Sequence, residues 1–359
     1  MFLHMVTAEA PSLSLKTEVR AARQLGADWD EYVRKHAHGS PFHLEAWKKC
    51  VEETYGFQAF YIEARRGLAL AGVLPLFLVD NLLTGKVLMS TPFAVYGGAL
   101  ADDPAAYEAI AGKVRMLGQE LGVQYVELRN AHAEQVLGFS PLNRYVTFVQ
   151  TLGSTEQSIL ESIPRKTRRM VRKSVEAGFT TGVETVDPGH FEELYARNLR
   201  RLGTPAFPSR HFTNILKHFK DSVAIHQHHL NGELAGAVLT FYFRDRLLPY
   251  YGASNPALNA AAPNNFMYFD LMRWGKANGF EVFDFGRSKK AAASGSYDFK
   301  SHWGMTELEL PYEILLVKRK NLPNFSPANP AFAWPLKIWS RLPLALTRWL
   351  GPWLIRLVP

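Results

Sequence analysis

Apolar and polar positions along the first half of the chain alternate between helical spacing and strand spacing. Residues 28–56 have helical periodicity, with Asp28 and Pro41 near two expected helix starts. A third helical pattern at 104–121 ends at Gly122. Strand-like apolar runs cover residues 57–64, 69–79, 86–90 and 123–128. The pattern therefore predicts helices and strands mixed along one domain.

A second series of elements begins after Gly153. Helical patterns occupy residues 164–177, 189–202, 209–220 and 264–278. Strand patterns cover residues 222–230, 234–243, 246–252 and 281–285. The dipeptide Asn231-Gly232 separates the first two strands and is typical of a tight hairpin.

The two series resemble each other at two places. Ala71-Gly72-Val73-Leu74 corresponds to Ala235-Gly236-Ala237-Val238, and the strand after Gly122 corresponds to the strand after Gly279. Chance or generic patterning is the alternative, but a duplication predicts two α+β domains, each a mixed sheet flanked by helices. The expected divisions of the chain are an N-terminal extension at 1–24, domains at 25–152 and 153–318, and a tail at 319–359.

Composition places the chain among globular proteins, with 47% hydrophobic and 21% charged residues. The single cysteine, Cys50, excludes an intrachain disulfide and a cysteine-rich zinc site. The net charge is +8, yet no acidic residue follows Glu313, whereas seven of the 41 basic residues do. The other 34 basic residues nearly balance 33 acidic ones. The excess charge thus belongs to the tail, and no DNA partner is expected.

Targeting signals give a simple expectation. The start of the chain lacks a basic segment followed by an apolar run, and no uninterrupted apolar stretch reaches the ~18–20 residues of a membrane span. We expect the body of the protein in the cytoplasm.

The densest group of chemically useful residues lies at 283–304. A strand ending at Gly286 leads into a cationic loop and then a short aromatic helix, where Lys300 stands between Phe299 and Trp303. An ammonium group on a partly apolar wall stabilises an anionic transition state better than one in water. The alternative is a solvated loop whose aromatic residues only pack. Candidate site residues here are Arg287, Lys289, Tyr297, Lys300 and Trp303.

A second group is the basic stretch 163–173, where six of eleven residues are Lys or Arg. Four arginines recur at helical spacing, so one face can meet phosphates of a nucleotide or of RNA: Arg165, Arg168, Arg169 and Arg172. The alternative is a solvated helix face neutralised by acidic neighbours. We take Arg168 as a candidate binding residue.

Other chemistries lack their motifs. His226, His228 and His229 have no carboxylate pattern nearby, so no metal site is expected. There is no HExxH, GxSxG, Walker or GxGxxG sequence, which removes the main support for hydrolase, P-loop and Rossmann functions.

The order of hairpin, third strand and helix in the second half resembles GNAT-type acetyltransferases. Those enzymes bind the coenzyme A pyrophosphate on backbone N–H groups of a glycine-rich turn at a helix start. The equivalent stretch here, residues 252–263, has no glycine pair and no basic residue, and its two prolines remove donors. Coenzyme A binding of the usual kind is therefore not expected.

Several short motifs resemble the Fem-type peptidyltransferases, which are tandem GNAT-like proteins. They are Pro164-x-Lys166-Thr167, Asn198-Leu-Arg-Arg201-Leu-Gly203, Tyr250-Tyr251-Gly252-Ala253-Ser254, Asp284-Phe-Gly286 and Tyr297-x-Phe299-Lys300. The whole length is more similar to FemAB-related proteins of bacterial exosortase/PEP-CTERM systems. That likeness rests on residues 91–98, Tyr125-Val-Glu127-Leu-Arg129 and Gly295-Ser-Tyr297-Asp-Phe299-Lys300-x-x-Trp303-Gly304.

The resemblance implies two tandem GNAT-like domains and an aminoacyl or acyl transferase. Its substrate would be a cell-envelope precursor, of peptidoglycan or exopolysaccharide, and its donor aminoacyl-tRNA, with no bound cofactor. It makes Lys300 the catalytic cation, assigns Arg201 and Lys48 or Lys49 to the acceptor's diphosphate, and places Tyr251 in the cleft between domains. Gly286-Arg287 departs from the family's Gly-Gly. The alternatives are an acyl-CoA-dependent N-acyltransferase and a non-catalytic scaffold of exopolysaccharide assembly.

The tail has a composition of its own. It holds four of the eight tryptophans, Trp334, Trp339, Trp349 and Trp353, and basic residues between apolar ones. Pro335, Pro343 and Pro352 predict the starts of three short helices. Basic, tryptophan-rich amphipathic segments are typical of an anionic membrane surface, so we expect peripheral association with the inner face of the cytoplasmic membrane. The alternative is packing on the second domain.

Overall fold

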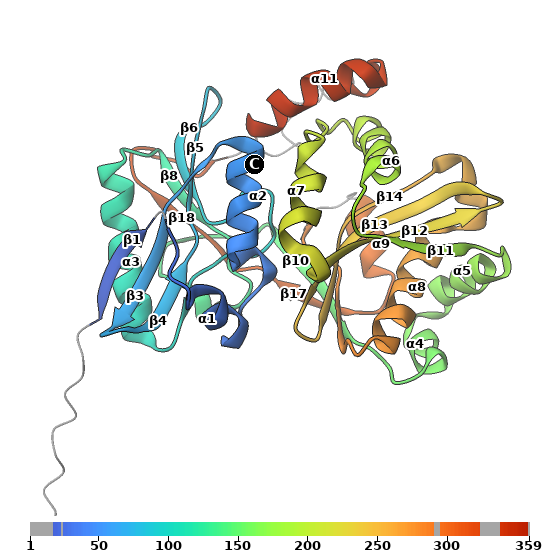
Figure 1. Ribbon diagram of the computed structural model, residues 1–359, viewed down its shortest axis with the longest axis horizontal. Helices are drawn as coiled ribbons and strands as arrows, with labels where there is room; N and C mark the ends of the chain where they lie inside the picture. The colour runs from blue at the N-terminus through green and yellow to red at the C-terminus, as the bar shows by residue number, and fades with distance from the viewer. Residues whose placement is uncertain (1–16, 23, 291–294, 324–337, 358–359) are drawn as a thin grey trace, which may run out of the picture.

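The computed structural model describes residues 17–22, 24–290, 295–323 and 338–357, and these form two α+β halves side by side (Figure 1). The helices of the first half are α1 (Trp29–Lys35), α2 (Glu45–Tyr55) and α3 (Pro104–Glu120). Its strands are β1 (Glu18–Ala22), β2 (Gln58–Ala59), β3 (Tyr61–Arg66), β4 (Ala69–Leu74), β5 (Phe77–Asn81), β6 (Gly85–Met89), β7 (Leu100–Ala101), β8 (Tyr125–Leu128) and β9 (Ser140–Leu142).

The remaining elements include those of the second predicted series and others that the pattern did not predict. The helices are α4 (Glu156–Ser162), α5 (Arg165–Glu176), α6 (Gly189–Arg201), α7 (Arg210–Phe219), α8 (Pro263–Ala277), α9 (Gly295–Ser301) and α11 (Leu344–Leu354). The strands are β10 (Tyr145–Thr151), β11 (Thr180–Glu184), β12 (Val223–Leu230), β13 (Glu233–Phe243), β14 (Arg246–Ser254), β15 (Val282–Asp284), β16 (Ser288–Lys289), β17 (Thr306–Glu309) and β18 (Tyr312–Leu316). Among the elements that were not predicted are α4, β10 and β18.

Helix α3 illustrates how local sequence sets an element. The Asp103 carboxylate accepts a hydrogen bond from the N–H of Ala106, and Pro104 occupies the first turn, where no donor is needed. Ile110 and Val114 are buried at helical spacing, and Gly122, with φ +63°, follows the end of the helix. The prediction of a helix at 104–121 is confirmed.

The sheets exchange strands between the two halves. The first half has a four-stranded sheet, β1-β3-β4-β7, and a six-stranded sheet, β2-β5-β6-β8-β18-β9. The second half has the order β11-β12-β13-β14-β15-β10-β16, with β17 also on β10. Strand β18 thus pairs in the first half and β10 in the second, so the expected divisions at 152 and 318 assign both strands to the wrong sheet. The pattern of apolar residues indicates that a strand is buried, but it does not indicate which sheet the strand joins.

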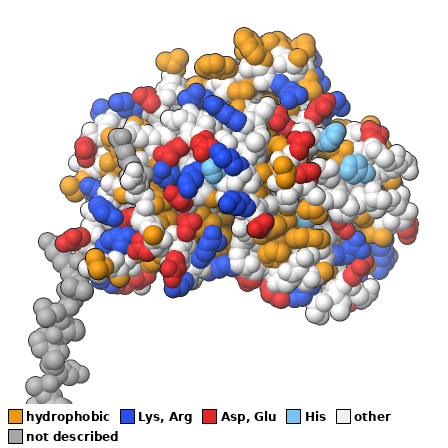
Figure 2. Space-filling view, viewed as in Figure 1, with side chains coloured by type: hydrophobic (Ala, Val, Ile, Leu, Met, Phe, Trp, Pro, Cys, Tyr) orange, Lys and Arg blue, Asp and Glu red, His pale blue; other side chains and the backbone are white. Residues whose placement is uncertain are grey.

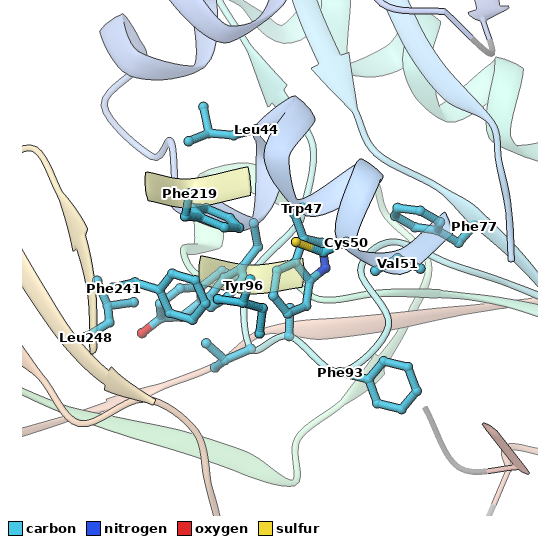
Figure 3. Close-up of a cluster of buried hydrophobic side chains, with 14 of the residues drawn as sticks. Leu44, Trp47, Cys50, Val51, Phe77, Phe93, Tyr96, Phe219, Phe241 and Leu248 are labelled. Atoms are coloured by element: carbon cyan, nitrogen blue, oxygen red, sulfur yellow. The ribbon is translucent and has the colours of Figure 1, made fainter. Parts of the chain in front are cut away.

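The two halves share one buried cluster (Figure 3). Trp47 and Cys50 of α2 lie beside Phe219 of α7 and Phe241 of β13. Polar contacts cross the same boundary, since the Cys50 thiol lies 3.3 Å from the carbonyl oxygen of Asn214. Apolar burial of this extent holds the halves in a defined arrangement.

Strands β14 and β15 separate soon after they begin. They pair in parallel only at Arg246 with Val282 and Leu247 with Phe283. Beyond that point β14 continues along β13, where the register shifts so that Tyr250 is the extra residue of a bulge. The end of β15 is thereby left open to groups from the first half.

The C-terminal segment forms fewer described helices than predicted. Helix α11 begins after Pro343, as expected, but Pro352 lies inside it rather than starting another helix. The helix ends two residues later, so the missing N–H of this proline affects only the last turn. Trp334 and Pro335 lie outside the described residues. No helix within the described ranges is long and apolar enough to cross a membrane.

Candidate functional site

A buried carboxylate marks the place where the two halves meet. Asp284, at the end of β15, has no exposed surface and accepts four hydrogen bonds. The donors are the hydroxyl of Thr147 at 2.6 Å, the hydroxyl of Tyr96 at 2.7 Å, the N–H of Gly286 at 2.9 Å and the guanidinium of Arg246 at 3.1 Å. Only Tyr96 comes from the first half. Asp284 therefore fixes the turn that follows β15 and ties it to the neighbouring half.

Lys300 of α9 caps that turn. Its ammonium nitrogen donates to the carbonyl oxygens of Phe285, Gly286 and Arg287 at 2.7, 3.1 and 3.3 Å. The turn is open to this approach because Gly286 has φ +66°, a conformation that favours glycine. Burial lowers the pKa of Lys300 to about 8, although the Asp284 carboxylate opposes this shift. The side chain is therefore mainly cationic at neutral pH.

Arg287 adds a second cation next to Lys300. Its guanidinium lies 4.8 Å from the centre of the Tyr145 ring. Burial opposes the charge, but electrostatic interactions with the side chains of Tyr312, Tyr145, Tyr250 and Glu127 raise the pKa of Arg287 above its usual value. A charged group persists here within aromatic surroundings, where its field is weakly screened.

The segment 90–98 of the first half, called the junction loop below, faces these groups. Arg129 donates hydrogen bonds of 2.8 Å to the carbonyl oxygens of Thr91 and Ala94. Phe93 has φ +62°, which is uncommon for a side chain of this size. Backbone strain of this kind persists only where neighbouring contacts hold it in place.

Tyrosines from other strands complete the fixation of the junction loop. The Tyr250 hydroxyl at the β14 bulge donates to the carbonyl oxygen of Phe93 at 2.9 Å. The Tyr312 hydroxyl of β18 donates to the carbonyl oxygen of Val95. The junction loop is thus held beside the turn at 284–287, on its first-half side.

Of the predicted residues, the structure joins Lys300 to Arg287 through the backbone carbonyl of Arg287, and three others lie near them. Lys289 is in β16, two residues beyond Arg287. Tyr297 donates a 2.7 Å hydrogen bond to the carboxylate of Glu307, which raises the pKa of the phenol. Arg168 is half-buried in the first turn of α5, next to Thr167, whose hydroxyl donates to the carbonyl oxygen of His302 at 2.6 Å. The basic helix therefore begins beside the Lys300 segment.

Two predicted contacts are corrected by burial. Trp303 is completely buried and packs against Phe285 and Tyr268, so it supports the turn from behind and does not line the site. Tyr251 does not line an open cleft. It lies in an aromatic cluster where His211 lies between the hydroxyls of Tyr55 and Tyr251, at 3.0 and 3.1 Å. Burial lowers the pKa of His211 to about 3, so this imidazole is neutral.

The residues assigned to an acceptor's diphosphate lie elsewhere. Lys48 and Lys49 of α2 form ion pairs with Glu52 and Glu45 at 2.6 and 2.9 Å, one helical turn away. Arg201, at the end of α6, donates to the Asn198 side chain at 2.8 Å. None of the contacts found among the described residues joins these three side chains to Lys300.

Sequence reasoning missed five residues that shape the site. They are Tyr96, Arg129, Tyr250, Asp284 and Tyr312, all of which contact the turn or the junction loop. The available signal was their position in motifs, since four of the five lie in the short sequences that carry the Fem resemblance: Tyr96, Arg129, Tyr250 and Asp284. A polar residue at the end of a buried strand is itself a sign of function.

The stretch equivalent to the coenzyme A turn is a short 3-10 helix at Pro256–Ala261. The side chain of Asn255 accepts a 3.1 Å hydrogen bond from the N–H of Ala257. Helix α8 then begins at Pro263, directly after Ala262 with φ +57°. Proline in this first turn leaves one N–H fewer for a phosphate.

Comparisons with known proteins agree with this architecture. Residues 162–301 match the family described as Acetyltransferase (GNAT) domain. The structure is similar to FemX, with a TM-score of 0.65, 15% identity, and coverage of 83% of this chain and 98% of FemX. No curated protein sequence matches the chain.

Two further structures share the fold. One is L-PGS from Bacillus licheniformis, with a TM-score of 0.51, 13% identity, and coverage of 86% of this chain and 99% of L-PGS. The other is a tandem GNAT protein from the clavulanic acid biosynthesis pathway, with a TM-score of 0.50, 11% identity, and coverage of 84% and 98%. The fold is a tandem GNAT fold, as the sequence predicted. The matched domain and this fold support an acyltransferase of GNAT type.

Proposed function

We propose that the protein is a Fem-type aminoacyl or acyl transferase acting on a cell-envelope precursor, of peptidoglycan or exopolysaccharide, in an exosortase/PEP-CTERM context. The observation that carries the proposal is the pair of cations, Lys300 and Arg287, held at the junction of two GNAT-like halves. FemX, a structure similar along most of this chain, gives the Fem comparison its support.

The proposed step is aminolysis of an ester. An acceptor amine attacks the ester carbonyl carbon, so a C–N bond forms and the C–O bond of the ester breaks. The amine proton passes through the substrate's own carboxylate to the departing hydroxyl oxygen. The Lys300 ammonium stabilises the negative charge that develops on the carbonyl oxygen of the ester. To do so it gives up its longest hydrogen bond, the one to the carbonyl oxygen of Arg287, and donates to the ester oxygen instead.

The donor in this proposal is aminoacyl-tRNA rather than acyl-CoA. The basic helix α5 begins beside the Lys300 segment, and its arginines suit the phosphates of an RNA end. Arg168 and Lys289 bind the donor, and Tyr297 orients α9 through Glu307. Arg201 and Lys48 or Lys49 bind the acceptor's diphosphate at a distance from the bond that forms.

An acyl-CoA-dependent N-acyltransferase is the second candidate, because the GNAT match covers residues 162–301. Thermal unfolding in the presence of acetyl-CoA, an aminoacyl-tRNA acceptor-stem mimic or a UDP-linked muropeptide separates the two. A ligand at a hundred times its Kd adds about 2.7 kcal/mol to the free energy of unfolding. Stabilisation by the RNA mimic or muropeptide supports the proposal, whereas stabilisation by acetyl-CoA alone selects the second candidate. No response to any of the three contradicts both and favours a scaffold.

The transfer rate is expected to fall as pH rises through about 8, where Lys300 loses its proton. The cation is the active form in the proposal, so activity is present below the pKa and lost above it. In the Lys300→Arg variant the guanidinium stays protonated, and the loss of rate above pH 8 should disappear even if the maximal rate is lower. Rate measurements on both proteins between pH 6 and pH 10 test this. If the variant loses rate above pH 8 as the wild type does, a group other than Lys300 is responsible for the pH dependence.

A further inference from the structure

Helix α11 has one face against the protein and an apolar face exposed. Thr347, Gly351 and Ile355 are buried at intervals of four residues. Trp349 and Trp353, also four residues apart, are each 68% exposed. Successive positions differ by 100° around a helix, so the tryptophans point away from the buried face.

The buried face of α11 is closely fitted. A Cβ atom on Gly351 would lie 2.6 Å from the backbone nitrogen of Ala206, so the helix contacts the backbone between α6 and α7. Arg348 forms a 3.0 Å ion pair with Glu192 of α6, and the Trp339 indole N–H donates to the carbonyl oxygen of Thr204 at 3.1 Å. The outward direction of Trp349 and Trp353 is therefore set by packing.

A hairpin of the first half extends the same face. The turn between β5 and β6 exposes Leu82 fully and Leu83 partly. Its neighbour Asn81 donates a hydrogen bond of 3.4 Å to the carbonyl oxygen of Arg356, just after α11. The hairpin and α11 lie at the same end of the molecule (Figure 1), and hydrophobic side chains gather there beside Lys and Arg side chains (Figure 2).

The charged residues of the C-terminal segment itself have one sign, although Glu192 of α6 neutralises one of them, Arg348. The described residues 338–357 contain three arginines, Arg341, Arg348 and Arg356, and the chain has no acidic residue after Glu313. Basic groups next to an exposed apolar helix face complement a layer of anionic headgroups above hydrocarbon.

We propose that this face, formed by Leu82, Leu83, Trp349 and Trp353, docks the protein on the surface of an anionic lipid bilayer. A membrane fits better than a folded partner because the apolar groups project as separate tips from both halves. Lipid adapts to such tips, whereas a protein partner needs a matching concave surface. The tryptophans and leucines insert among the acyl chains, and Arg341 and Arg356 meet the lipid phosphates. This inference is independent of the proposed chemistry.

Flotation with vesicles tests the inference on the full-length protein. We expect binding to vesicles of phosphatidylcholine with 30% phosphatidylglycerol, and at least about tenfold weaker binding to phosphatidylcholine alone. Trp349→Ser with Trp353→Ser should weaken binding to the anionic vesicles by at least about tenfold, and adding Leu82→Ser should weaken it further. These side chains are exposed, so the variants should keep the wild-type melting temperature.

A matched control is available in Leu68. This leucine is 95% exposed in the turn between β3 and β4, which lies away from α11 in Figure 1. The Leu68→Ser variant should bind vesicles as the wild type does. Equal binding by the tryptophan variant and the wild type overturns the proposal. A second result would also overturn it: the wild type forms dimers without lipid and does not bind vesicles, and the tryptophan variant is monomeric. A second copy of the chain would then be what covers this face. Transfer to a soluble acceptor should be unchanged in every variant. A failure of the membrane proposal can therefore be told apart from a failure of the proposed transferase function.

Discussion

The Lys300→Ala variant is expected to lose the transfer activity while remaining folded. Removing one preorganised donor from a site that stabilises an oxyanion lowers kcat by roughly a hundred- to a thousandfold. The fold should persist because two effects of Lys300 on stability oppose each other. Burial disfavours its charge, as the lowered pKa indicates, while its three hydrogen bonds to carbonyl oxygens favour the folded state.

Product formation and circular dichroism melting of the same sample provide the measurement. Lys290→Ala is the matched control, because Lys290 lies close in sequence but forms an exposed ion pair with Glu309 at 2.7 Å. That variant should keep the wild-type rate. Wild-type turnover by Lys300→Ala would remove Lys300 from the chemistry. In cells, normal polymer output from Lys300→Ala and Tyr297→Phe, combined with no output from a deletion, would indicate a scaffold.

The secondary structure could be predicted from local patterns because its determinants are local. Helix α3 has its cap, its first-turn proline and its terminating glycine within twenty residues of sequence, and the hairpin of β12 and β13 has Asn231-Gly232. The sheets could not be predicted in the same way. Strand β10 joins β15 and strand β18 joins β8, and both pairings connect residues more than a hundred positions apart. Nothing in the strands' own alternation specifies those partners.

Site residues could be predicted from the sequence where the side chain has few alternative roles, and could not where the same side chain is common in both cores and binding sites. A lysine between two aromatic residues suggested an ammonium on a partly apolar wall, and Lys300 is half-buried with its ammonium against the turn after β15. The indole side chain of Trp303 suits the wall of a binding cleft as well as a hydrophobic core. The sequence alone could not show which of the two it occupies, and only the packing in the structure does. The adjacent tyrosines of β14 differ for another reason. The bulge at Tyr250 sends that side chain toward the junction loop, while Tyr251 lies in the aromatic cluster.

Asp284→Asn is expected to lower the free energy of unfolding by about 3 kcal/mol. The amide has the shape of the carboxylate but carries no charge, and its NH2 group would face donors. Arg246 then loses its ionic partner, and some of the Thr147, Tyr96 and Gly286 donors lose their acceptor. Urea unfolding gives the value, and Asp80→Asn on the exposed part of β5 is the control, with an expected change below about 0.5 kcal/mol.

A double-variant cycle with Tyr96→Phe shows whether Asp284 also joins the two halves. Tyr96→Phe alone removes one buried hydrogen bond and should lower the free energy of unfolding by about 1 kcal/mol. If the 2.7 Å bond between Tyr96 and Asp284 carries that loss, Tyr96→Phe should matter little once Asp284→Asn is present. Additive losses would mean that Tyr96 stabilises the fold through its ring alone. Because Tyr96 belongs to the junction loop and Asp284 to the Lys300 turn, strong coupling would also predict slower transfer in Tyr96→Phe, even though Tyr96 contacts neither cation.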